Sequence, residues 1–172
     1  MNDLGTTTEQ GTVRLERLLP GPIERVWAYL TESDKRATWF AAGTFDLRVG
    51  GKADLHFNHA NLSSEKRPPD EYKDMKTDYP GKITRLEPPR LLSYTFEAAG
   101  PESEVTFELE PRGKDVLLVI THRRIKDRKT MINVASGWDT HIGILGDRLN
   151  GVEPRPFWST HAKLVGEYEA RL

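Results

Sequence analysis

Residues 130–150 read TMINVASGWDTHIGILGDRLN, and this stretch decides the fold of the chain. Its apolar side chains recur every three or four residues, which is the pattern of a helix with one buried stripe. The stripe consists of Ala135, Trp138, Ile142, Leu145 and Leu149. About 21 helical residues span roughly 30 Å, enough to cross a small sheet. We therefore predict one long helix, ended by Asn150-Gly151, whose stripe is buried against a sheet.

The segments before this helix alternate between apolar and polar side chains, as half-buried strands do. The clearest case is Val105, Phe107 and Leu109 between glutamates and a threonine. Gly50-Gly51 separates two further strand-like segments and predicts a hairpin turn. We expect about seven antiparallel strands, over residues 12–19, 44–49, 53–57, 81–87, 92–96, 104–110 and 116–122.

The remaining segments suggest short helices, a loop and two terminal pieces. Pro22, Ile23, Val26 and Leu30 indicate a short amphipathic helix, and a second one should end near Phe40. Residues 58–78 are polar and contain two prolines, so we predict a long surface loop that is the most mobile internal segment. Residues 1–11 should be a disordered tail, 12–151 the folded domain and 152–172 a C-terminal extension packed on it, whose residues permit a final helix.

Composition excludes several classes of protein. The 25 basic and 26 acidic residues give a net charge of −1 without a long block of one sign, so a nucleic-acid partner is not expected. The absence of cysteine removes disulfides and thiolate metal sites. No run of about 18 apolar residues is present, which argues against membrane insertion and makes the cytoplasm the default location. We expect neither a metal nor a cofactor.

Several short motifs occur in a characteristic order. They are Pro22 to Trp27, Trp39-Phe40, Asp46 to Gly51, Gly81 to Leu91, and Gly137-Trp138 at the start of the helical stripe. In this order they resemble the START-like, birch-pollen-allergen-like superfamily (helix-grip, SRPBCC). More narrowly, they resemble its bacterial branch of proteins named for the activator of the ninety-kilodalton heat-shock protein ATPase. The resemblance implies an α+β helix-grip fold: a curved antiparallel sheet of about seven strands, with two short helices, gripping one long C-terminal helix around a cavity. It implies less about function, because carriers, receptors, cyclases and co-chaperones share this scaffold.

The inward-facing side chains of such a fold are the candidate ligand site. We predict that it is formed by Trp27, Leu55, Phe57, Tyr94, Phe96, Phe107, Trp138, His141, Ile142 and Leu145. His141 lies at the edge of the helical stripe, where a neutral imidazole could hydrogen-bond a ligand carbonyl or hydroxyl. The alternative is that His141 lies at the rim of the cavity and contacts water. Whether the aromatic side chains fill the interior or leave room depends on volume, which the sequence does not decide.

Three functions are compatible with these features. The first is a carrier or sensor that binds a small hydrophobic molecule, lipid-like, aromatic or polyketide-like. The second is a co-chaperone-like interaction module, for which only the basic run from Arg123 to Lys129 offers a docking patch, and the chain would be a monomer or homodimer with a chaperone or other protein partner. The third is a cyclase, aromatase or hydrolase in which His141, His122, Tyr94 and Asp139 supply acid and base. No HExxH motif or nucleophile elbow supports the third, so no catalytic residue is assigned.

Overall fold

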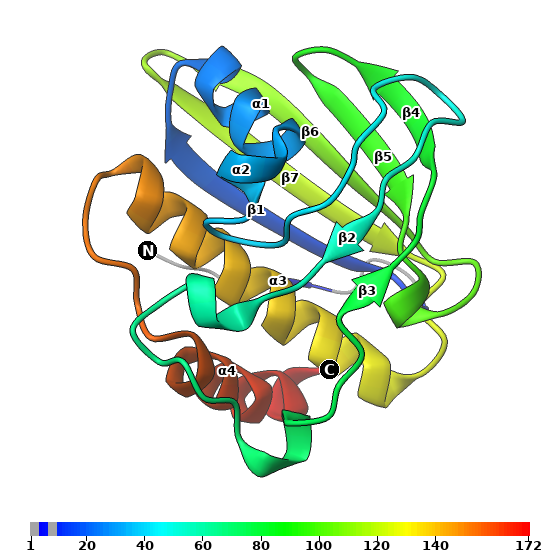
Figure 1. Cartoon of the computed structure of the whole chain (residues 1–172), viewed down its shortest axis with the longest axis vertical. Coiled ribbons are helices and arrows are strands. Elements are labelled where there is room, and N and C mark those ends of the chain that lie inside the picture. The colour runs from blue at the N-terminus through cyan, green and yellow to red at the C-terminus, as the bar shows by residue number, and fades with distance from the viewer. Residues whose placement is uncertain (1–3, 7–9) are drawn as a thin grey trace.

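The computed structural model describes residues 4–6 and 10–172, and in it a curved antiparallel sheet lies across one long helix, as the helix-grip prediction required (Figure 1). The main sheet has the strand order β1-β7-β6-β5-β4. Its strands are β1 (Val13–Pro20), β4 (Ile83–Glu87), β5 (Leu91–Thr95), β6 (Glu104–Arg112) and β7 (Asp115–Arg123). The long helix is α3 (Arg128–Leu149), and α4 (Phe157–Arg171) runs beside it, farther from the sheet.

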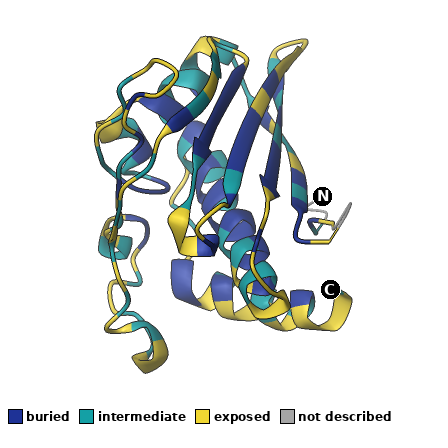
Figure 2. Cartoon of the chain, turned by 90° about the vertical axis from the view of Figure 1, so that its right-hand side faces the viewer, coloured by how far each residue is buried: buried dark blue, intermediate teal, exposed yellow. Residues whose placement is uncertain are grey.

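The core lies between the inner face of the sheet and α3. Phe107 pairs with Ile120 and Leu109 with Leu118, so these four side chains share one face, and all are at most 4% exposed. The predicted helical stripe meets this face: Trp138 is 3% exposed, Ile142 2% and Leu145 0%. Figure 2 shows buried residues along the central strands and along α3. The predicted burial of the stripe is confirmed.

Two short helices follow β1, as expected, but the second is shorter than predicted. They are α1 (Ile23–Thr31) and α2 (Ser33–Arg36), so α2 ends four residues before Phe40. The fully buried guanidinium of Arg36 donates hydrogen bonds to backbone carbonyl oxygens of Thr31, Ala41 and Gly43. It also lies 3.6 Å from the ring centroid of Phe45. The chain folds around this cation instead of continuing the helix.

The predicted hairpin at residues 44–57 is largely irregular. The described residues form seven strands, five in the main sheet and two in a separate ribbon. The ribbon pairs β2 (Leu55–His56) with β3 (Asp78–Tyr79). The expected strand at 44–49 is reduced to a single bridge between Phe45 and Ala53. A Cβ at Gly51 would collide with the carbonyl oxygen of Asp46, which shows how tightly the backbone folds back here. This turn leaves no room for a regular ladder.

Residues 58–78 are not a bare surface loop. They contain two 3-10 turns, η1 (His59–Asn61) and η2 (Asp70–Tyr72), and Leu62 is completely buried. The segment is attached to α4, because Ser63 Oγ accepts a hydrogen bond from the backbone N–H of Phe157 at 2.9 Å. Glu65 accepts two more from Ser159. The segment thus remains mostly exposed but is held to the domain at Leu62, Ser63 and Glu65.

The predicted disordered tail, 1–11, falls partly on residues 1–3 and 7–9, which lie outside the described residues. In the described part, the N–H of Gly5 donates to the Tyr168 hydroxyl at 2.6 Å, and Thr6 bridges to Arg14. Among the residues that the structure describes, no helix is both long and apolar enough to cross a membrane.

Candidate functional site

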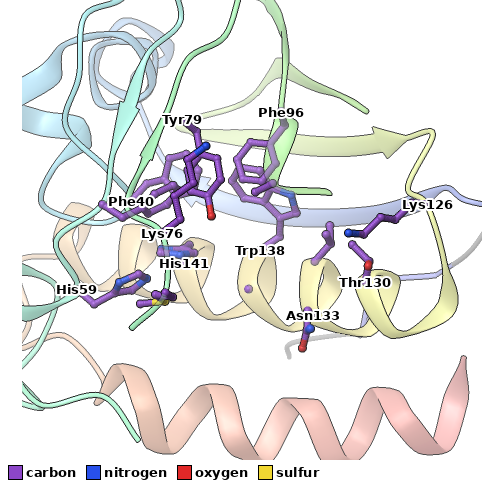
Figure 3. A pocket seen from close by; sticks show the side chains of 15 residues that line it. Phe40, His59, Lys76, Tyr79, Phe96, Lys126, Thr130, Asn133, Trp138 and His141 are labelled. Atoms are coloured by element: carbon purple, nitrogen blue, oxygen red, sulfur yellow. The ribbon is translucent and has the colours of Figure 1, made fainter. Parts of the chain in front are cut away.

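A pocket of about 390 Å³ opens at the N-terminal half of α3 (Figure 3). One wall is α3 itself, another comes from the end of β5 and η3 (Glu97–Ala99), and a third from the two ends of the 58–78 segment with Phe57 and Tyr79 beside them. The lining residues are Phe40, Phe57, His59, Met75, Lys76, Tyr79, Phe96, Ala98, Lys126, Thr130, Asn133, Val134, Gly137, Trp138 and His141. Most of this surface is aromatic or aliphatic, as in pockets that bind small organic molecules.

Aromatic rings form the rigid side of the pocket, and Phe40 lies at their centre. Its ring centroid is 4.8 Å from that of Trp138, 5.0 Å from Phe57 and 4.9 Å from His141. The Phe57 and His141 contacts are edge-to-face, the arrangement that aromatic pairs favour. These rings come from three separate segments of the chain, so the wall exists only in the folded protein.

A series of buried hydrogen bonds holds Trp138 and Phe96 of this wall in place. The indole N–H of Trp138 donates to His122 Nδ1 at 2.9 Å, so the ring proton of His122 is on Nε2, which donates to Ser103 Oγ at 3.2 Å. Ser103 Oγ in turn donates to the carbonyl oxygen of Phe96. Burial lowers the pKa of His122 to about 3, so the ring is neutral. Every member has a partner, and this network orients the Trp138 ring and ties down the backbone at Phe96.

His141 presents a hydrogen-bond acceptor to the pocket. Its Nδ1 lies 2.8 Å from the carbonyl oxygen of Trp39, which can only accept, so Nδ1 carries the proton. Burial lowers the pKa of this imidazole to about 3, and the residue is 5% exposed. The other nitrogen, Nε2, therefore holds a free lone pair, and no hydrogen bond joins it to any group in the described part of the chain. His141 therefore lies in the buried wall of the pocket.

The charged groups of the pocket are two exposed lysines, Lys76 and Lys126, which lie on opposite sides of Trp138 (Figure 3). Among the described residues that line the pocket there is no aspartate or glutamate. The Lys76 ammonium lies 4.9 Å from the ring centroid of Tyr79. Within residues 4–6 and 10–172, neither lysine forms an ion pair. Burial also lowers the pKa of His59 to about 4, so this ring adds no charge near pH 7.

The structure brings four of the ten predicted site residues into this pocket: Phe57, Phe96, Trp138 and His141. Five others, at most 3% exposed, fill the adjacent core and do not line it: Leu55, Tyr94, Phe107, Ile142 and Leu145. Trp27 is half-buried on α1 and packs against the core, also away from the lining. The open space thus lies toward the start of α3 and not along the Trp138–Leu149 face.

Several lining residues were missed by sequence reasoning. They are His59, Met75, Lys76, Tyr79, Ala98, Lys126, Thr130, Asn133, Val134 and Gly137, together with Phe40, which was noted only as part of a motif. Gly137 carried a usable indication, because a glycine inside a helix costs about 1 kcal/mol and calls for a reason. Here a Cβ at Gly137 would meet nothing within 4 Å. Residues 75–79 offered no such indication.

The acid and base groups of the enzyme alternative do not converge. His141 lines the pocket, whereas both nitrogens of His122 are occupied. Asp139 lies in a different cluster: it accepts from Arg17 at 2.6 Å and from the Tyr168 hydroxyl at 2.7 Å. Across the described ranges, no group of three or more histidine, aspartate or glutamate side chains is arranged to hold a metal ion.

Comparison with known proteins agrees with the fold. The family model described as "Activator of Hsp90 ATPase homolog 1-like protein" matches residues 20–150. A Bordetella parapertussis protein solved by NMR is 44% identical, with a TM-score of 0.82 over 98% of this chain and 90% of that one. CalU16 from Micromonospora echinospora is 24% identical, with a TM-score of 0.70 over 99% and 96%. DynU16, from the dynemicin biosynthetic locus, is 19% identical, with a TM-score of 0.67 over 87% and 51%. No curated protein matches the sequence.

Proposed function

This chain belongs to the Activator of Hsp90 ATPase homolog 1-like family, and we propose that it binds one small apolar molecule, as a carrier or sensor, in the pocket at the start of α3. The observation that carries this proposal is the pocket's construction. A rigid aromatic wall around Phe40 and Trp138 offers apolar contact, and the bare Nε2 of His141 offers one oriented polar contact. Large apolar contact with few placed polar groups is how small-molecule sites combine affinity with orientation.

The volume of the pocket limits the size of the ligand. At about 390 Å³ it lies at the lower end of the range of roughly 300–1,000 Å³ for small-molecule sites. Flat rings would stack well on Phe40, Trp138 and Phe96, so an aromatic or polycyclic molecule fits this wall better than a long flexible chain.

The co-chaperone-like alternative would need a coherent exposed patch. Among the described residues, the exposed large apolar side chains are Leu18 on β1, Leu47 and Val49 in the irregular hairpin, and Val152 after α3. They belong to three separate segments, which supports a lower rank for this alternative.

The test uses purified full-length chain and the neutral fluorescent probe N-phenyl-1-naphthylamine, with native mass spectrometry to detect any co-purified molecule. We expect one probe per chain. Gly137→Leu should weaken binding at least about tenfold, equivalent to 1.4 kcal/mol, because its side chain enters the pocket. The helix should tolerate this change, since leucine has the higher helix propensity and nothing lies within 4 Å of the added Cβ.

The matched control is Gly166→Leu on α4, where a Cβ also meets nothing within 4 Å and the site is remote from the pocket lining. It should bind the probe as the wild type does. Folded wild-type protein that takes up no apolar probe would refute the carrier proposal and place the interaction-module alternative first. Unchanged binding by Gly137→Leu would move the ligand site elsewhere.

A further inference from the structure

The two ends of the pocket differ in chemistry. His141 is 5% exposed and lies among the aromatic rings, while Lys126 is exposed beside the first turn of α3. Figure 3 shows the two residues at opposite ends of the row of lining side chains. Between them the α3 wall consists of Trp138, Gly137 and Val134. A ligand that spans the pocket therefore meets a hydrogen-bond acceptor at one end and a cation at the other.

The tautomer of His141 sets what the buried end recognises. Because Nδ1–H is used by the Trp39 carbonyl, only the lone pair of Nε2 is available to a ligand. A ligand carbonyl, which also only accepts, would leave two acceptors facing each other. A hydroxyl or N–H group is complementary, and leaving this nitrogen without a donor in a closed, dry pocket would cost binding free energy.

The charge of Lys126 sets what the other end recognises. In the described ranges neither Lys126 nor Lys76, which lies nearer His141 and beside Tyr79 (Figure 3), has a carboxylate partner. The nearest acidic neighbour in sequence, Asp127, does not line the pocket, and it accepts the backbone N–H of Thr130 at 2.8 Å as the cap of α3. The pocket lining thus has a net positive charge at neutral pH, and an anion of the ligand would be attracted to it.

We propose, building on the proposed function, that the ligand is amphipathic: a largely aromatic molecule with a hydroxyl or N–H donor that reaches His141 Nε2 and an anionic group that reaches Lys126. A hydroxylated aromatic acid is the simplest member of this class. The anion can be a carboxylate, a sulfonate or a phosphate, since an ammonium group recognises all three as charge.

The charge is tested with two probes that share one ring system. 1-Anilinonaphthalene-8-sulfonate carries an anion, and N-phenyl-1-naphthylamine lacks it. The double variant Lys76→Gln/Lys126→Gln, which removes both positive charges from the pocket lining, should bind the sulfonate about three- to tenfold more weakly and the neutral probe with unchanged affinity. The control Lys73→Gln/Lys129→Gln removes the same charge from exposed lysines outside the pocket and should change neither affinity.

These outcomes separate the two proposals. Failure of the wild type to bind either probe refutes the proposed function. Binding of the neutral probe, with equal effects of the two double variants on the sulfonate, refutes the anionic ligand alone, because the effect would then come from net charge. Replacing the sulfonate by 1-naphthoate or 1-naphthyl phosphate identifies which anion is preferred.

The donor end is tested with protein whose histidines carry ¹⁵N. Adding 1-naphthol should shift the Nε2 resonance of His141 upfield, as hydrogen bonding to a bare nitrogen does, and adding naphthalene should not. His141→Asn keeps a side-chain N–H for the Trp39 carbonyl but removes the acceptor at the Nε2 position, so it should lose the preference for naphthol over naphthalene. Bound naphthol that leaves this resonance unmoved would overturn the assignment of the donor.

Discussion

The two halves of α3 face different surroundings, although one apolar stripe runs through both. In the second half, Ile142, Leu145 and Leu149 are at most 4% exposed, and a Cβ at Gly146 would lie 3.7 Å from Leu19 of β1. In the first half, Gly137 faces open space and Trp138 forms the wall of a pocket. The comparison shows that helical periodicity reports which side of a helix is buried, and not whether the facing elements fill the space.

The cause of the difference is the identity of the opposing chain. The second half lies beside β1, since a Cβ at Gly146 would lie 3.7 Å from Leu19, and strands present apolar side chains at fixed spacing. In the first half Trp138 packs on Phe107 of β6, but the space beside Gly137 is bordered by the irregular chain around residues 75–79. An irregular wall does not interdigitate with the helix in this way, so space remains between rings that are themselves firmly held.

The largest effect that distinguishes the halves is expected from truncation of Leu145, which is completely buried. Leu145→Ala should lower the free energy of unfolding by about 2–5 kcal/mol, because it creates a cavity in a filled core. Val134→Ala, in the pocket wall, should cost only about 1 kcal/mol, since that side chain already borders empty space. Urea unfolding followed by circular dichroism measures both. Equal costs would show that the second half is no better packed than the first.

The next effect concerns acid, because neutral histidines lie in and beside the pocket wall. Burial holds the pKa of His122 and of His141 at about 3, against about 6.5 in an unfolded chain. The unfolded state therefore binds more protons below pH 6.5, so stability is full above that pH and is lost as the pH falls from about 6.5 toward 3. Each of these two histidines should contribute about 1.4 kcal/mol of loss at pH 5.5.

Unfolding free energies at pH 7.5 and 5.5 should thus differ by about 3 kcal/mol, with His59 and His161 acting in the same direction because burial lowers the pKa of each. His122→Gln should be less stable than the wild type at both pH values but should show a smaller pH dependence. A wild-type stability that stays constant across this range would mean that the histidines are hydrated and the wall is looser than described.

Much of the fold could be predicted from local patterns, since burial repeats with the period of each element. Val105, Phe107 and Leu109 alternate in β6, and Trp138, Ile142 and Leu145 recur in α3, and all lie inward as predicted. The hairpin at residues 44–57 was over-predicted, because glycines suggest a turn but do not show how the chain on either side pairs. There the tight return at Gly51 prevents a regular ladder.

The candidate site could be predicted only in part, because its walls depend on contacts between distant segments. Phe57, Phe96, Trp138 and His141 follow from their own periodic elements. The wall at residues 75–79 has a polar composition typical of a free loop, yet its segment is held by contacts such as Ser63 with Phe157, which are 94 residues apart. No local pattern encodes such a contact, and side-chain volume alone decides whether Tyr94 and Phe107 fill the core or line a pocket.

The smallest expected effect is also the most specific to the comparison, because it contrasts two glycines of the same helix. At Gly137 a Cβ meets nothing within 4 Å, so Gly137→Ala should raise the free energy of unfolding by about 0.5–1 kcal/mol through helix propensity. At Gly143 a Cβ would lie 2.7 Å from the guanidinium of Arg155, which is paired with Asp147 at 2.8 Å. Gly143→Ala gains the same propensity but must displace this pair, so its net effect should be smaller or destabilising. Urea unfolding of the two variants side by side measures the difference, with Gly166→Ala on exposed α4 as the reference for propensity alone. Equal stabilisation at positions 137 and 143 would show that Arg155 moves aside without a measurable cost. A lower free energy of unfolding for Gly137→Ala would show that there is no empty space beside the first half of α3.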